Sequence, residues 1–96
     1  MRRDEVLAIL AAHQDEIKAH GVKSLALFGS VVHDEAGPES DIDLLLEVER
    51  PFGMFALGRL QIYLEGLLGR PVDLVFRDSI KPQLRDRILG EAVDAA

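Results

Sequence analysis

Two stretches decide the fold: Val22 to Ser30 reads Val-Lys-Ser-Leu-Ala-Leu-Phe-Gly-Ser, and Asp41 to Val48 reads Asp-Ile-Asp-Leu-Leu-Leu-Glu-Val. Each holds a short apolar run bounded by turn or polar residues, which is typical of a buried β-strand. We therefore predict strands over 22–28 and 41–48, the first running directly into Gly29-Ser30. Polar residues stand at the ends of both strands. Any chemistry is therefore expected at those ends.

Working outward, helical and strand patterns alternate along the rest of the chain. Apolar residues recur at helical spacing before, between and after the strands, and a third apolar run precedes the last helical pattern. The resulting order, α-β-β-α-β-α, predicts an α/β (α+β) fold with a small mixed sheet of about three to four strands flanked by helices. The remaining elements are expected as helices over 4–19, 52–68 and 82–95, a strand over 71–76, a short helical turn over 31–33 and a loop over 34–40.

Length and charge restrict the classes of function. A chain of 96 residues is expected to form one domain, 1–96. Its net charge of −6 disfavours direct binding of nucleic acid, because no basic stripe offsets the acidic excess. It contains no cysteine, which excludes disulfides and thiolate chemistry. No apolar stretch is long enough to span a membrane, and the N-terminus lacks the core of a signal peptide, so we expect a cytoplasmic protein.

Three aspartates stand out as candidate metal ligands. Side chains alternate along a strand, so Asp41 and Asp43 project to one face, with Cα atoms about 6–7 Å apart. Two such carboxylates repel each other unless a cation lies between them. Asp73 lies within an otherwise apolar run and could join them if its strand pairs with theirs. The alternatives are solvated or turn-capping roles for the pair, and an edge or strand-end position for Asp73.

The turn after the first strand is a candidate phosphate site. Glycine at position 29 allows a sharp turn and close approach of a phosphate. The hydroxyl and backbone N–H of Ser30 can donate hydrogen bonds to phosphate oxygens. The alternative is an ordinary turn in which the serine caps a short helix. Gly-Ser followed by Asp-x-Asp and a later Asp, all at strand ends, is less common than any one of these features.

This combination resembles the minimal nucleotidyltransferase (MNT) family, within the DNA polymerase beta-like superfamily. The resemblance extends over nearly the whole chain, from the leading helix through Leu-Phe-Gly-Ser, Ser-Asp-Ile-Asp-Leu-Leu and Pro-Val-Asp-Leu-Val to the closing Ile-Lys-Pro-Gln-Leu-Arg. It implies that Gly29 and Ser30 hold a triphosphate, that Asp41 and Asp43 bind Mg²⁺, and that Asp73 is a third catalytic, metal-binding carboxylate.

The resemblance also implies an activity and a partner. Family members of this size resemble antitoxins paired with a HEPN-type toxin, and such an antitoxin transfers AMP from ATP to a tyrosine hydroxyl of its toxin. The chain departs from the family pattern at Val31-Val32-His33-Asp34, where basic residues are common. Two other functions therefore stay open. One is a weakened or inactive domain that neutralises its partner by direct binding, and the other is a subunit that binds nucleotide without turnover.

Three other features have an expected structural role and an alternative. His13 is expected at the edge of the core rather than as a metal ligand. The basic residues Lys81, Arg85 and Arg87 are expected to form a solvated face, with contact to a partner or to phosphates as the alternative. The apolar segment 51–55 is expected to complete the core, with an exposed contact patch as the alternative.

Overall fold

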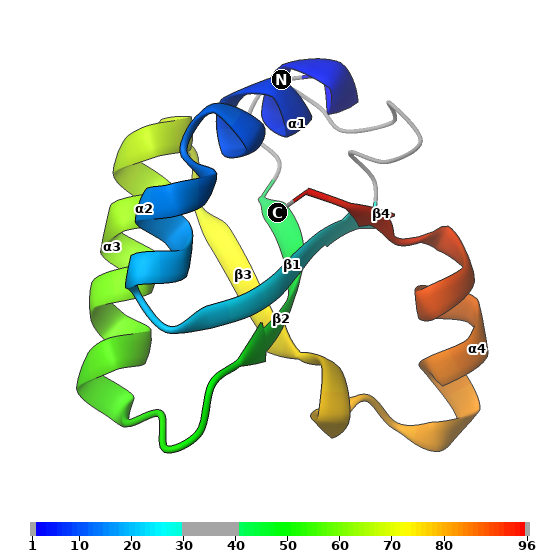
Figure 1. Cartoon of the computed structure of the whole chain (residues 1–96). Helices are drawn as coiled ribbons and strands as arrows, with labels where there is room; N and C mark the ends of the chain where they lie inside the picture. Colours follow the sequence, from blue (N-terminus) through cyan, green and yellow to red (C-terminus); the bar gives the residue numbers. More distant parts are fainter. Residues whose placement is uncertain (1, 30–40, 96) are drawn as a thin grey trace.

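The computed structural model describes residues 2–29 and 41–95, which form a mixed sheet with helices on both faces (Figure 1). The order of elements is the predicted one, with a fourth strand added after the last helix. In chain order the elements are α1 (Arg3–Ala12), α2 (Gln14–Ala19), β1 (Val22–Phe28), β2 (Ile42–Val48), α3 (Met54–Leu68), β3 (Val72–Phe76), the 3-10 helix η1 (Arg77–Ser79), α4 (Pro82–Glu91) and β4 (Val93–Asp94).

The four strands form one sheet in the order β3-β2-β1-β4. Strand β1 runs antiparallel to both of its neighbours, with Leu27 opposite Leu44 on β2 and opposite Val93 on β4. Strands β2 and β3 run parallel, and α3 is the crossover between them. The sheet is therefore mixed, as predicted, and β2 is a central strand that begins within the Asp-x-Asp motif.

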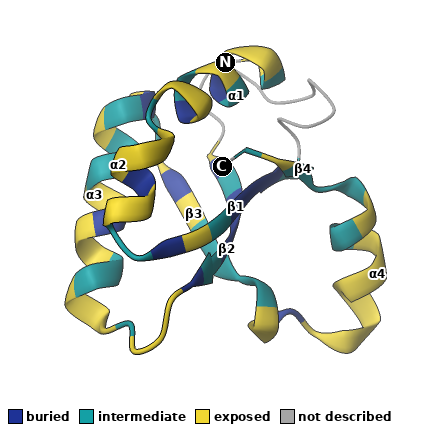
Figure 2. Ribbon diagram, viewed as in Figure 1, coloured by how far each residue is buried: buried dark blue, intermediate teal, exposed yellow. Residues whose placement is uncertain are grey.

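The main core lies between the sheet and helices α1, α2 and α3 (Figure 2). Alternate residues of β2 enter this core, so Ile42, Leu44 and Leu46 are each at most 1% exposed. Helix α3 contributes Leu60 and Leu64, both fully buried. The period-2 alternation of β2 sends its odd-numbered residues, which include Asp43, to the opposite face of the sheet.

Helix α4 packs on that opposite face through a smaller cluster. Ala26 of β1 and Leu45 of β2 are buried there, together with Ile80 between η1 and α4. Ile88 and Leu89 of α4 pack against these residues. No residue of α4 is itself buried, so this helix covers its face of the sheet less completely than the other three cover theirs.

Two helices have boundaries that differ from the sequence prediction. The helix expected over 4–19 is divided at His13, whose backbone (φ −116°, ψ 23°) leaves the helical region. The Nδ1 atom of His13 lies 2.9 Å from the carbonyl oxygen of Ile9, and the ring is half-buried, as expected for a residue at the core edge. The helix expected over 82–95 ends at Glu91, because Ala92 is extended and leads into β4.

The start of α3 corrects both the predicted boundary and the predicted packing. The helix begins at Met54 rather than at residue 52, because Gly53 is extended (ψ 171°) and forms its N-cap. Phe52 packs against the core, as predicted for this apolar segment. Met54 and Phe55 do not, since they are 88% and 87% exposed. The strands predicted over 41–48 and 71–76 each begin one residue later, at Ile42 and Val72.

Tyr63 on α3 makes a polar and aromatic contact with α2 and its C-terminal cap. Its hydroxyl donates a hydrogen bond to Oε2 of Glu16 at 2.6 Å, and its ring stacks on His20 with centroids 4.7 Å apart. Burial raises the pKa of Tyr63 to about 12, assisted by the hydrogen bond to Glu16 and by its charge.

Because Tyr63 is the single tyrosine of the chain, its ionisation can be followed by ultraviolet absorbance. We expect a midpoint near pH 12, and a lower midpoint in Glu16→Gln, because the neighbouring negative charge that opposes phenolate formation is gone. Asp15→Asn, one residue earlier on the same helix, is the control and should leave the midpoint unchanged. Equal midpoints in wild type and Glu16→Gln would contradict this contact.

No helix within residues 2–29 and 41–95 is long and apolar enough to cross a membrane.

Candidate active site

The turn after β1 places glycine against a carboxylate of the neighbouring strand. Gly29 has φ +79°, a left-handed conformation that side chains with a Cβ rarely adopt. A Cβ at this position would collide with the Oδ2 atom of Asp43 and would lie 3.2 Å from its Cγ. Backbone and carboxylate are therefore in direct contact here. Ser30 and the departure at 31–34 lie outside the described residues, as do the turn and loop predicted over 31–40.

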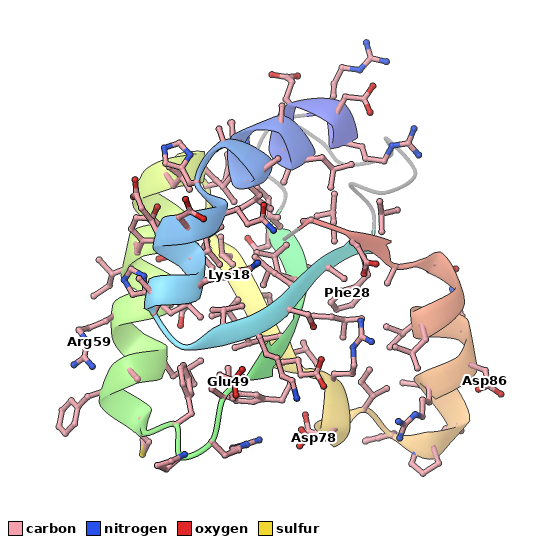
Figure 3. All side chains as sticks on the ribbon, in the orientation of Figure 1. Lys18, Phe28, Glu49, Arg59, Asp78 and Asp86 are labelled. Atoms are coloured by element: carbon pink, nitrogen blue, oxygen red, sulfur yellow. The ribbon has the colours of Figure 1, made fainter. Side chains whose placement is uncertain are left out.

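The sheet register brings two of the three predicted aspartates side by side. Asp43 is the partner of Asp73 in the parallel pairing of β2 with β3, and on its other side it pairs with Phe28 of β1. Figure 3 shows Phe28 on the side of the sheet that faces α4. Asp41 precedes β2 by one residue and is exposed. The three residues thus gather at one corner of the sheet, next to Gly29.

The environments of the carboxylates differ. Asp43 is half-buried on a central strand, whereas Asp73 is exposed on β3, which is an edge strand. The edge position considered as the alternative for Asp73 is thus the one observed. Burial raises the pKa of Asp43 above its ordinary value, and the negative charges of Asp73 and, to a smaller degree, Asp41 raise it further. The corner therefore gathers negative charges around Asp43 and disfavours its ionised form.

The residues fit a divalent cation by their chemistry. Carboxylate oxygens are the ligands that Mg²⁺ and Ca²⁺ prefer, and a cation would relieve the repulsion that raises the pKa of Asp43. Within residues 2–29 and 41–95, no group of three or more His, Asp or Glu side chains is already arranged to hold a metal ion. Coordination by all three aspartates therefore requires side-chain rotation, which is open to the exposed Asp41 and Asp73.

The coupling between the paired aspartates can be measured in metal-free protein. We expect the Asp43 carboxyl to titrate above the ordinary aspartate range, and Asp73→Asn to lower its pKa, because a neighbouring like charge is removed. The pKa should stay above the ordinary value, since burial is the larger cause. Carboxyl ¹³C NMR against pH gives both values. Asp78→Asn, on η1 beyond the other end of β3, is the control. An Asp43 pKa equal in wild type and Asp73→Asn would refute the coupling.

Sequence reasoning missed a polar group on this face of the sheet. Arg77 directly follows Phe76, the last residue of β3, and is the first residue of η1. It lines a cavity of about 280 Å³ at the opposite end of β2 and β3. No sequence pattern indicated this residue, because it lies just beyond the predicted strand and its cavity also involves Arg85 of α4.

Comparison with known proteins assigns this chain to a family. Residues 10–95 match the family model described as the nucleotidyltransferase domain. Protein adenylyltransferase MntA of Thermococcus cleftensis is 38% identical over 91 residues, which cover 94% of this chain and 92% of that protein. The match therefore extends over nearly the full length of both proteins.

Solved structures agree with the fold. A structure assigned as a minimal nucleotidyltransferase superposes with a TM-score of 0.83 at 36% identity, and covers 97% of this chain and 95% of the other. An MNT antitoxin from Shewanella oneidensis, in complex with its tri-AMPylated HEPN toxin, is a more distant neighbour. It has a TM-score of 0.65 at 18% identity, covers 94% of this chain and 71% of that one, and supports the fold alone.

The matched family model, the relative of similar length and the superposed structure agree on one family. This chain belongs to the nucleotidyltransferase domain family of enzymes, among its minimal nucleotidyltransferases.

Proposed function

We propose that this chain transfers AMP from ATP to a hydroxyl group of a partner protein, a tyrosine of a HEPN-type toxin, and thereby acts as a cytoplasmic antitoxin. The observation that carries the proposal is the contact of Gly29 with Asp43, beside Asp73 in register on the next strand. This arrangement offers a backbone that a phosphate can approach closely, next to carboxylates that suit a divalent cation.

The proposed reaction is a displacement at the α-phosphorus of ATP. The acceptor oxygen attacks that phosphorus, the bond to the β-phosphate oxygen breaks, and pyrophosphate leaves while the hydroxyl proton passes to a base. We assign Gly29 and Ser30 to the triphosphate and Asp73 to the acceptor hydroxyl, whose proton its carboxylate can accept. Catalysis of this kind depends mainly on positioning and charge stabilisation, which a small domain can supply.

Magnesium is the proposed cofactor. When bound by Asp41, Asp43 and Asp73, it would neutralise charge on the phosphates and lower the pKa of the attacking hydroxyl. The raised pKa of Asp43 supports this assignment, because the ionised carboxylate is destabilised at this position and a bound cation would stabilise it.

The proposed acceptor rests on the relatives. The Thermococcus cleftensis relative is named a protein adenylyltransferase, and the Shewanella oneidensis neighbour is an MNT antitoxin in complex with an AMPylated HEPN toxin. A domain of 96 residues has little surface from which to build a complete acceptor site, so a partner protein that supplies part of that site fits its size.

The test is the intact mass of the protein encoded beside this one, after incubation with this chain, ATP and Mg²⁺. We expect an AMP-sized increment that requires both ATP and the divalent cation. No increment, with a stable complex still formed, would refute the transferase and favour neutralisation by direct binding. Nucleotide binding without pyrophosphate release, even with the partner present, would favour a regulatory subunit.

A further inference from the structure

A second polar site lies on the aspartate face of the sheet, at its other end. The cavity of about 280 Å³ is lined by Arg50 after β2, Arg77 on η1 and Arg85 on α4, together with two carboxylates, Glu47 and Asp78. Figure 3 shows Asp78 on η1, at the lower end of the sheet. Three guanidinium groups against two carboxylates leave one net positive charge, in a chain whose total charge is −6.

The two carboxylates of the cavity already have partners. Asp78 pairs with Arg50 at 3.3 Å, and Glu47 accepts a hydrogen bond from the Ser24 hydroxyl at 3.0 Å. The remaining arginines are not engaged by them. The Nε atom of Arg77 is buried and has no hydrogen-bond partner among residues 2–29 and 41–95, which is costly for a charged donor. An oxyanion in the cavity is a suitable partner for these guanidinium groups, because carboxylate and phosphate match the planar fork of arginine.

The spacing connects this cavity with the proposed reaction. Residues 43 and 47 of β2 lie on one face, four residues or about 13 Å apart at ~3.3 Å per residue. If the triphosphate of ATP lies at Gly29 and Asp43, its charges are at the opposite end of this face. The cavity is therefore placed to receive an anionic group of the other substrate, the acceptor.

We propose that Arg77 and Arg85 form an oxyanion-binding site that holds a carboxylate or phosphate group of the acceptor polypeptide, at the end of the sheet opposite the aspartates. The acceptor assignment rests on the function proposed above, whereas oxyanion binding by the cavity does not. Because the rest of the chain is acidic, this local positive charge would offset the repulsion of an acidic acceptor segment and would fix its orientation over the aspartates.

Oxyanion binding can be tested on the chain by itself. The side-chain Nε–H signal of Arg77 is followed by ¹⁵N NMR during titration with inorganic phosphate and, separately, with glutarate. We expect a saturable shift that Arg85→Gln weakens by about tenfold. Arg87→Gln is the control, because Arg87 lies on the same helix but pairs with Glu91 and is 77% exposed. The probe that saturates at the lower concentration identifies the preferred group, and no shift with either would overturn the proposal.

The acceptor assignment is tested by transfer kinetics with the partner protein. Arg85→Gln should raise KM for the acceptor by about tenfold while kcat and KM for ATP stay unchanged, and Arg87→Gln should change none of them. Equal acceptor KM in wild type and Arg85→Gln would overturn the assignment even if transfer is normal. If wild type transfers nothing, the proposed function fails and the acceptor role fails with it, while the NMR titration still decides whether the cavity binds an oxyanion.

Discussion

Replacing Asp43 with asparagine lowers the rate of AMP transfer by on the order of 10³-fold and leaves the fold intact. Asp43 lies between Gly29 and Asp73, so its loss removes the central carboxylate of the proposed metal site. Charge stabilisation by a bound metal is worth several kcal/mol in the transition state, and every 1.36 kcal/mol is tenfold in rate. Single-turnover transfer to the partner, with saturating ATP and Mg²⁺, measures the loss.

The same substitution should make the protein slightly more stable at neutral pH. The folded-state pKa of Asp43 is raised, so its ionised form destabilises the fold at pH values above that pKa. As pH falls through the raised pKa, the folded protein takes up the proton first and the penalty disappears. Urea unfolding without metal, at neutral pH and at a pH below the raised pKa, measures this effect. The gain in the free energy of unfolding for Asp43→Asn should be present at neutral pH and should vanish in acid.

Asp86→Asn is the matched control, because it removes the same charge from an exposed position. Figure 3 shows Asp86 on α4, pointing away from the sheet. It should change neither transfer nor the pH dependence of stability. Normal transfer by a clean Asp43→Asn preparation would refute the proposed reaction centre, and a loss of stability at neutral pH would refute the repulsion that we assign to this carboxylate.

Gly29→Ala should lower the rate of transfer by about 10²-fold. The cause is displacement of the Asp43 carboxylate or of the turn, because no metal ligand is removed. The added Cβ would meet the Asp43 carboxylate and would lie 3.2 Å from its Cγ, so the side chain or the turn must move. A displacement of about 1 Å at a reacting centre is enough for an effect of this size. The left-handed backbone adds a stability cost of about 1–2 kcal/mol.

Gly69→Ala separates the two effects of that substitution. Gly69 has φ +68°, close to the value at Gly29, but apart from its two chain neighbours no described residue lies within 4 Å of an added Cβ. This variant should therefore lose a similar stability to backbone strain and retain full transfer. Equal transfer in Gly29→Ala and Gly69→Ala would show that contact with Asp43 is unimportant. Parallel unfolding and transfer assays on both variants decide the question.

Local patterns allowed the sequence to predict much of the fold. The strand from Val22 to Phe28 was predicted with its observed bounds, because an apolar run between turn residues has few alternatives. The two-residue strand β4 was missed, since Val93 and Asp94 follow a helical pattern and pair with β1 only through tertiary contact. The division of the first helix at His13 was missed as well, because apolar spacing continues through it.

The candidate site could be predicted in composition but not in arrangement. The sequence identified Asp41, Asp43 and Asp73 by type and position. The pairing of Asp43 with Asp73 depends on the parallel register of β2 and β3, which is set by the packing of α3 and is not encoded in either strand alone. Arg77 escaped notice because its cavity is formed by segments far apart in sequence, and only the folded chain brings Arg50 and Arg85 beside it.

The position of Asp73 on an edge strand has a consequence for the behaviour of the protein in solution. The outer side of β3 has no neighbouring strand within the described residues, and such an edge can recruit a strand from another molecule. A charged side chain near one end of this otherwise apolar edge opposes that association. We therefore expect the residue assigned to the acceptor hydroxyl to oppose self-association as well, so variants that neutralise it should aggregate more readily at high concentration.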